Sequence, residues 1–223
     1  MFRELLEAWR SKDVLSQMYE ELSQMLEDTE WMFRSVCGVL LEGKPGAQLS
    51  EEIYSRDVRV NKTERRIRKQ IVEHLVMCPG THVAACLVLM SVVKDAERIG
   101  DFCKNLFEVE AMSRGPLAGD GYVRAFSELS GDIASTFEKT RTALGEGDSD
   151  LGHEIIEHEL EIGHRCDDLV KRLAEDALEC RQAVTFTLTA RYLKRVSAHL
   201  GNIASSVVMP IHKIDYFDEK WHR

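Results

Sequence analysis

The sequence predicts an all-α protein built from two tandem three-helix bundles that are related by pseudo-twofold symmetry. Three observations support this fold class. The chain has only four prolines in 223 residues, and helix-forming Leu, Glu, Ala, Lys and Arg dominate long stretches. Turn signals rich in glycine and proline divide the chain into six such stretches. The last three stretches then repeat a residue pattern of the first three.

The turn signals place six long helices, and long helices with short connections favour antiparallel bundles. We expect them at about residues 13–42, 49–77, 81–112, 121–144, 149–179 and 182–208. The break between the third and fourth helices is the sequence SRGPLAGDG at residues 113–121. A further short helix is predicted at residues 1–10, because Phe2, Leu5, Leu6 and Trp9 would share one side of it.

The internal repeat appears at an offset of 97 residues. In the third and sixth helices this offset places Lys94, Arg98, Ile99, Asn105 and Leu106 on Arg191, Arg195, Val196, Asn202 and Ile203. In the second and fifth helices it places Asp57, Asn61, Glu64 and Arg68 on Glu154, His158, Glu161 and Arg165. We therefore assign residues 1–112, with the short N-terminal helix, to the first repeat and residues 117–223 to the second.

The charge of the chain argues against nucleic acid as a partner. The sequence has 38 acidic and 29 basic residues and a formal net charge of -9, whereas binding to a phosphate backbone requires positive charge. The longest apolar run, residues 83–93, is about half of a bilayer span. We expect a protein that is cytoplasmic or peripheral to the inner membrane.

One face of the third helix carries the residues with the clearest capacity for chemistry. Glu97, Asp101, Asn105 and Glu108 follow one another at helical spacings of four, four and three, so they lie within one quadrant. Two carboxylates and an amide oxygen side by side can hold a hard divalent or ferric ion. The same pattern also describes an ordinary solvated helix face, so spacing alone leaves both interpretations open.

A second set of candidate ligands lies on the fifth helix. Glu161 and His164 form an E-x-x-H element, the kind that ferritin-like di-iron enzymes use in pairs on two helices. The predicted helices contain this element once, which makes a di-iron enzyme the weaker alternative. The sequence also lacks a G-x-x-x-x-G-K-[ST] loop, a G-x-S-x-G elbow and an H-E-x-x-H helix. We expect no enzymatic activity.

The sequence ERIGD at residues 97–101, followed by Asn105 and Glu108, resembles the signature of the PhoU family. The stretch DVRVNKTERRI at residues 57–67 resembles a looser pattern in the second helix of that family's repeat. The resemblance extends over nearly the whole chain. It implies two PhoU repeats and a regulator of phosphate transport that acts by protein contact.

The resemblance also implies partners and a cofactor. The partners would be a phosphate transporter or a phosphate-sensing histidine kinase at the cytoplasmic membrane face, or a second copy of the chain in a homodimer. The cofactor would be a divalent or ferric metal ion, such as iron, zinc or magnesium, held by Glu97 and Asp101. Asp57, Asn61, Glu64 and Asn105 are candidates to complete the metal site. A metal-free helical adaptor for another ion transporter remains an alternative.

The second repeat departs from the family pattern at the two acidic positions. Lys194 stands where the glutamate belongs, and Ala198 stands where the aspartate belongs. A cation and a methyl group cannot bind a metal ion, so at most one of the two metal sites is retained. His199 matches a family histidine whose place in the first repeat is taken by Phe102, and we expect it to pack or to form a local hydrogen bond.

Overall fold

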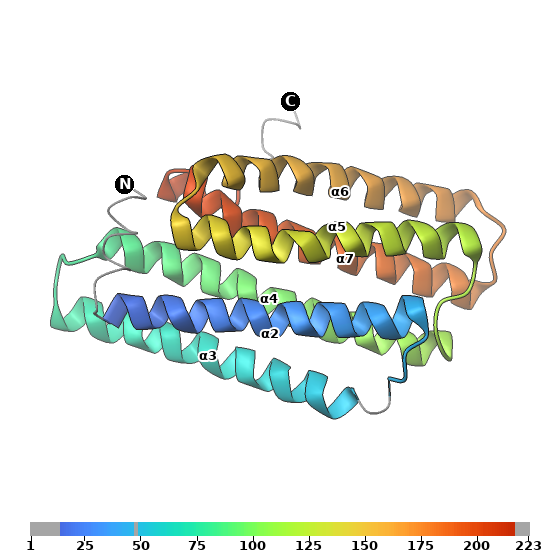
Figure 1. Cartoon of the computed structure of the whole chain (residues 1–223), viewed down its shortest axis with the longest axis horizontal. Coiled ribbons are helices and arrows are strands. Elements are labelled where there is room, and N and C mark those ends of the chain that lie inside the picture. Colours follow the sequence, from blue (N-terminus) through green and yellow to red (C-terminus); the bar gives the residue numbers. More distant parts are fainter. Residues whose placement is uncertain (1–13, 47–48, 217–223) are drawn as a thin grey trace.

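The computed structural model describes residues 14–46 and 49–216, and this part of the chain forms six long helices (Figure 1). They are α2 (Val14–Glu42), α3 (Ser50–Met77), α4 (Val83–Ser113), α5 (Asp120–Glu146), α6 (Ser149–Glu175) and α7 (Cys180–Val208), followed by the short 3-10 turn η1 (Ile211–Lys213). The predicted all-α class is confirmed. The helix predicted at residues 1–10 lies outside the described residues.

The helix ends agree with the predicted ones to within two residues, apart from the end of α6. This helix ends at Glu175 and not at residue 179, because Asp176 adopts an extended backbone with φ of -88° and ψ of 147°. At its other end, the side chain of Asp148 accepts hydrogen bonds from the backbone N–H groups of Asp150 and Leu151. This N-cap satisfies donors that the first helical turn would otherwise leave unpaired.

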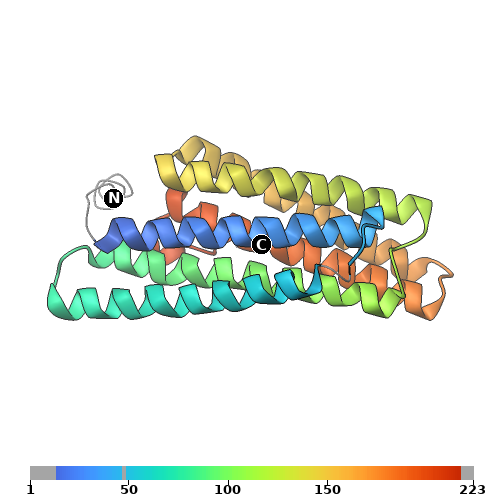
Figure 2. The same ribbon diagram turned by 60° about the horizontal axis from the view of Figure 1, so that its bottom comes forward.

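Each half of the molecule is a three-helix bundle, and all the helices run along its long axis (Figure 2). In the first half α4 packs against α2 and α3, and in the second half α7 packs against α5 and α6. The halves meet where α4 packs on α7 and α2 packs on α5. Both of these contacts join helices in equivalent positions of the repeat, as a twofold axis between the halves requires.

Side chains at the contact between α4 and α7 confirm the offset of 97 residues for this pair of helices. Phe102 and His199, which the offset makes equivalent, stack on one another with ring centroids 5.6 Å apart. The contact between Asp95 and His199 likewise has its counterpart in the aromatic pair of Tyr192 and Phe102. The axis therefore passes between α4 and α7, which occupy equivalent positions but carry different side chains at their contact.

The offset of 97 residues is wrong for α3 and α6. It would place buried Asp57 and Glu64 on Glu154 and Glu161, which are both exposed. An offset of 99 instead places the buried residues Ile53, Asp57, Val60, Glu64 and Ile67 on the buried residues Gly152, Ile156, Glu159, Gly163 and Cys166. The number of residues that separate equivalent positions is thus two smaller between α6 and α7 than between α3 and α4. Two residues turn a helix by about 200°, so the ungapped alignment matched opposite faces.

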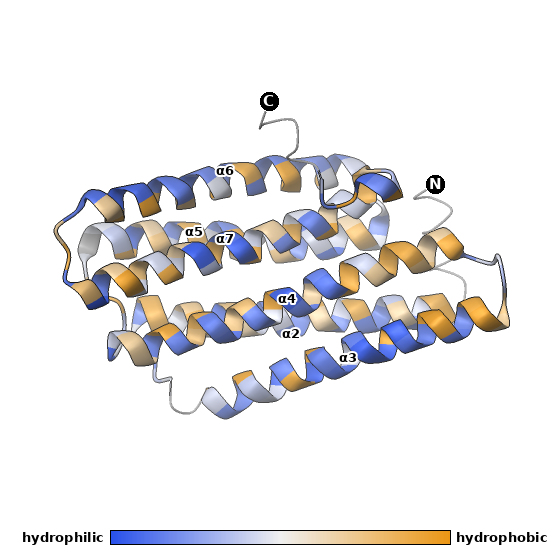
Figure 3. Cartoon of the chain, turned by 180° about the vertical axis from the view of Figure 1, so that it is seen from behind, coloured by the Kyte–Doolittle hydropathy of each residue, from blue (hydrophilic) through white to orange (hydrophobic). Residues whose placement is uncertain are grey.

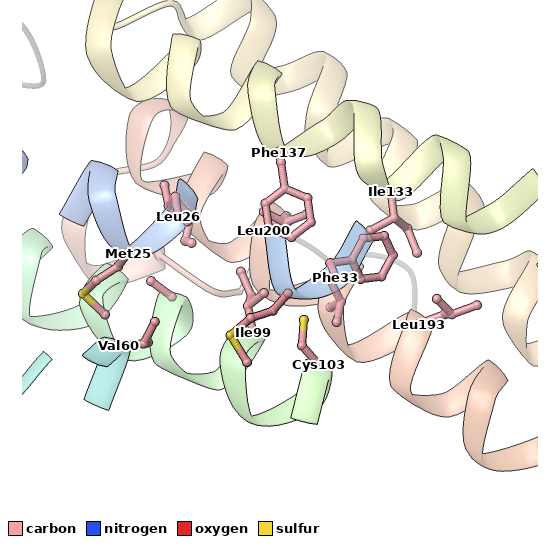
Figure 4. Packing of buried hydrophobic residues seen from close by; sticks show 14 of the residues in the cluster. Met25, Leu26, Phe33, Val60, Ile99, Cys103, Ile133, Phe137, Leu193 and Leu200 are labelled. Atoms are coloured by element: carbon pink, nitrogen blue, oxygen red, sulfur yellow. The ribbon is translucent and has the colours of Figure 1, made fainter. Parts of the chain in front are cut away.

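One large hydrophobic core joins all six helices. Figure 4 shows Phe33 of α2 beside Phe137 of α5, with Ile99 of α4 and Leu200 of α7 nearby. The two phenylalanine rings have centroids 5.6 Å apart, and both side chains are completely buried. Residues from both repeats interdigitate here, so the two halves share this core, and among the described residues only a small separate cluster of Ala143, Ile155 and Ala204 lies within the second half.

The outer edge of the molecule is polar over most of α3 (Figure 3). The exception is the end of α3 next to the start of α4, where Val76 and Met77 are 72% and 80% exposed. None of the described helices combines the length and the apolar character needed to cross a membrane.

Candidate functional site

The candidate site lies where α4 faces α3. Glu97 and Asp101 point from α4 with side chains that are 13% and 27% exposed, so neither belongs to a freely solvated face. Asp57 and Glu64 on α3 are buried, with residue exposures of 7% and 6%. Four of the predicted site residues thus lie on two helices that pack against each other.

Lys104 is the side chain that connects the two helices at this site. From α4 its Nζ donates to Asp57 Oδ2 on α3 at 3.2 Å and to Asp101 Oδ1 at 3.3 Å. Asn61 adds a hydrogen bond from its Nδ2 to Asp57 Oδ2 at 3.4 Å. Burial alone would lower the pKa of Lys104, but the contacts with both aspartates outweigh it and raise the pKa. Lys104 is therefore charged at neutral pH.

The other carboxylates of the site also have cationic partners. Lys94 Nζ lies 2.7 Å from Glu97 Oε2, and Arg98 lies 3.3 Å from Asp101 Oδ2. On α3, Arg68 lies 2.8 Å from Glu64 Oε1. The four carboxylates Asp57, Glu64, Glu97 and Asp101 are thus matched by the four cations Arg68, Lys94, Arg98 and Lys104. The site has no excess negative charge for a metal ion to neutralise.

The oxygen donors of this set suit a hard cation, but their arrangement does not fit a resident metal ion. Across residues 14–46 and 49–216, no three His, Cys, Asp or Glu side chains come close enough together to hold one. Asn105 is half-buried on α4. Metal binding at Glu97 and Asp101, completed by Asp57, Asn61, Glu64 or Asn105, stays a prediction that needs a rearrangement of the ion pairs.

The second repeat uses ion pairs between the equivalent helices. Lys194 Nζ of α7 lies 2.6 Å from Asp167 Oδ2 of α6, and Arg191 reaches the other oxygen of the same carboxylate at 3.4 Å. Lys194 therefore does more than remove a ligand, because it ties α7 to α6. Neither Lys194 nor Arg191 is a free cation on the surface.

The histidines of α6 do not form a di-iron site. Glu161 and His164 are exposed, whereas di-iron ligands project into the core of a helical bundle. His158 Nδ1 lies 3.4 Å from Thr136 Oγ1 of α5. This geometry argues against the enzyme alternative.

A polar network that the sequence did not predict lies between α4 and α7. Asp95 Oδ1 is 2.7 Å from His199 Nδ1 and accepts a hydrogen bond from Asn202 Nδ2 at 2.9 Å. His199 therefore packs on Phe102, as one of its two expected roles requires, and its hydrogen bond is not local but reaches across to α4 of the other repeat. One signal could have revealed the network, because Asp95 interrupts the apolar stripe that Val92 and Ile99 continue.

The chain after α7 folds back onto this network. Asp215 accepts a hydrogen bond from Ser91 at 3.3 Å, and its backbone N–H donates to Ser205 Oγ at 3.1 Å. Its Oδ1 is buried without a hydrogen-bond partner among the described residues. Burial and the nearby charge of Asp95 raise the pKa of Asp215 to about 6, although the Ser91 hydrogen bond and His199 act in the opposite direction.

We expect Asp215→Asn to stabilise the protein at pH 7.5, with a gain that shrinks as the pH falls below about 6 and disappears below the ordinary pKa of 3.8. Between the ordinary pKa of 3.8 and the folded value of about 6, the folded state binds more protons than the unfolded state, so stability falls as pH rises. Asparagine mimics the neutral carboxyl. Allowing for partial exposure, the gain at pH 7.5 should be about 1 kcal/mol, measured as a rise in Tm. Asp168→Asn is the control, because a hydrogen bond from Lys171 lowers the pKa of that exposed carboxyl. An equal gain in the control would contradict the assignment.

A groove of about 970 Å³ lies between α2 and α3 and is lined only by residues of these two helices of the first repeat. Tyr54 and Val58 of α3 are exposed in it, and Arg59 and Lys62 line it together with Glu21 of α2. The mixture of exposed apolar and charged side chains is typical of a surface that binds another protein.

Comparison with known proteins supports the resemblance to the PhoU family. The family model described as the PhoU domain matches the chain twice, at residues 15–109 and 126–207. The fold is similar to the crystal structure of PhoU from Pseudomonas aeruginosa, with a TM-score of 0.73 and 21% identity over 93% of this chain and 97% of that chain. It is also similar to the phosphate transport system regulatory protein PhoU from Streptococcus pneumoniae, with a TM-score of 0.72 and 15% identity over 93% and 95% of the two chains. A search of curated protein sequences finds no significant match.

Proposed function

The chain belongs to the PhoU family, and from this premise we propose that it regulates phosphate transport and phosphate-responsive signalling by contact with other proteins. The observation that carries the proposal is the family match to both repeats. Because the matched segments include the helices of the shared core, they describe most of the folded molecule. The protein would act without chemistry of its own.

The proposed partners are a phosphate transporter, a phosphate-sensing histidine kinase, or both, at the cytoplasmic face of the membrane. A rigid bundle can regulate such a partner by binding one of its conformations more tightly than another. The groove between α2 and α3 is the surface we propose for this contact. Its exposed Tyr54 and Val58 would form the apolar centre, and the charged side chains around them would form the rim.

Deleting the gene in its own host should raise phosphate uptake in phosphate-rich medium and activate phosphate-responsive promoters. Expression of the full chain should reverse both effects. Val58→Glu should fail to do so, because a charge in the apolar centre of a contact weakens binding. Val184→Glu on α7 is the matched control, since Val58 and Val184 are both 48% exposed. Normal phosphate uptake in the deletion strain would contradict the proposal.

One observation favours a second candidate function, an adaptor for another ion transporter. The second repeat has exchanged the acidic pair of the family pattern for Lys194 and Ala198, and Lys194 now binds Asp167. A chain that has diverged at this position could serve a different client. Altered uptake of another ion in the deletion strain, with unchanged phosphate uptake, would support the adaptor.

A further inference from the structure

Lys104 occupies the space between the carboxylates that the family pattern would assign to a metal ion. Its ammonium group lies within hydrogen-bonding distance of Asp57 on α3 and of Asp101 on α4. The side chain is 24% exposed, and the Asp57 side chain is 10% exposed. The charged contact is therefore largely shielded from water. An ion pair in such a shielded place is stronger than one on an open surface.

We infer that the ammonium group of Lys104 serves as the cation that joins α3 to α4, so that the first repeat needs no resident metal ion. An ammonium carries three N–H donors and can therefore satisfy carboxylates from two helices at once. It is also covalently attached to the protein. The connection between the helices would then not depend on the concentration of any metal in the cell.

The charge balance of the site supports this inference. A divalent cation binds most tightly where several carboxylates lack other partners, and it takes six or more oxygen ligands. Here Glu97 pairs with Lys94, and Glu64 pairs with Arg68. A metal ion would have to displace Lys104 and add positive charge to a neutral group of side chains.

In the second repeat, another lysine joins the central helix to the outer helix. Gly201 stands at the position equivalent to Lys104, so that position cannot supply a cation. Lys194, at the family's glutamate position, instead reaches from α7 to Asp167 on α6 at 2.6 Å. In both repeats a lysine on the central helix thus binds an aspartate on the outer helix, although the two lysines come from different positions in the sequence.

The test compares metal content and metal response in the wild-type protein and in Lys104→Met. Protein purified without a histidine tag should carry far less than one metal ion per chain, and EDTA should leave its Tm unchanged. Lys104→Met keeps the apolar stem but leaves Asp57 and Asp101 without their ammonium. This variant should melt at a lower temperature, recover part of the loss in millimolar MnCl₂, and bind Mn²⁺ in an electron paramagnetic resonance titration.

Lys69→Met is the matched control, because Lys69 forms an exposed pair with Glu73 at 3.6 Å. It should neither lose stability nor bind Mn²⁺. Wild-type protein with one metal ion per chain, whose removal by EDTA lowers the Tm, would overturn the inference. So would a Lys104→Met variant that behaves like Lys69→Met.

A second variant covers the case in which Lys104→Met does not fold. The double change Asp57→Asn plus Lys104→Met removes both charges of the pair between the helices. It should fold and show no affinity for Mn²⁺, which would confirm that charge is what Lys104 supplies. Failure of this double variant to fold would overturn the inference, since removing the negative charge of Asp57 would then not compensate for the loss of the ammonium group of Lys104.

Discussion

Phe137→Ala is expected to lower the free energy of unfolding by about 3–5 kcal/mol, the usual cost of truncating a fully buried phenylalanine. Phe137 lies on α5 and packs against Phe33 of α2 across the boundary between the repeats. The substitution leaves a cavity between helices that are held by contacts on both sides, so the surroundings can collapse only partly. Urea denaturation followed by circular dichroism measures the loss.

The same experiment tests whether the repeats unfold as one unit. Because their buried residues form one core, both halves should lose structure in a single transition, in the wild-type protein and in the variant. Phe107→Ala is the control, since Phe107 is only half-buried at the edge of α4 beside Tyr54. It should cost about 1 kcal/mol. A cost of that size for Phe137→Ala, or separate transitions of the two halves, would show that the contact between α2 and α5 is weak.

The fold was predictable because its main determinants are local. Strong helix formers, separated by clear turn signals, determine the helices and most of their ends. The duplication was also visible, because a match such as Asn105 with Asn202 lies within one helix of each repeat and needs no knowledge of the turns. The match of α3 with α6 failed for a physical reason. A change of two residues in the spacing between the helices leaves no signal in either helix, yet it rotates the matched face by more than half a turn.

The sequence predicted which side chains could form the candidate site but not the contacts that they make. Helical spacing placed Glu97 and Asp101 on one face, and the family pattern pointed to Asp57 and Glu64. Whether an acidic face recruits a metal or a lysine depends on distances between helices, which the sequence does not contain. Lys104 had a signal of its own, because it lies three residues after Asp101 and so shares the acidic face. Its reach to Asp57 on α3 appears only in the structure.

Asp28 was not predicted at all, although it holds the most buried carboxylate in the described ion pairs. Its side chain is 4% exposed on α2 and binds two arginines of α3. Arg56 Nη1 lies 2.6 Å from Oδ1, and Arg59 Nε lies 2.8 Å from Oδ2. The guanidinium of Arg56 also lies over the ring of Trp31 at 4.1 Å. Asp28 stands in the polar run EDTE at residues 27–30, so the sequence does not single it out for such a cluster.

Asp28→Asn is expected to lower the free energy of unfolding by about 2–3 kcal/mol. The amide keeps the shape of the side chain but leaves the inner arginine, Arg56, without its buried counter-charge. The loss should be smaller than for a fully buried pair, because Arg59 is half exposed and water can solvate it. Urea denaturation at low and high salt measures the effect, which should persist in high salt because the carboxylate is shielded from ions.

The control is Glu52→Gln, which removes the other partner of Arg56, a carboxylate that is 44% exposed. Exposed pairs contribute little, so this change should cost less than about 1 kcal/mol and its effect should vanish in high salt. Equal losses in the two variants would contradict this expectation. They would mean that burial of Asp28 adds no stability to the link between α2 and α3 beyond that of an exposed carboxylate.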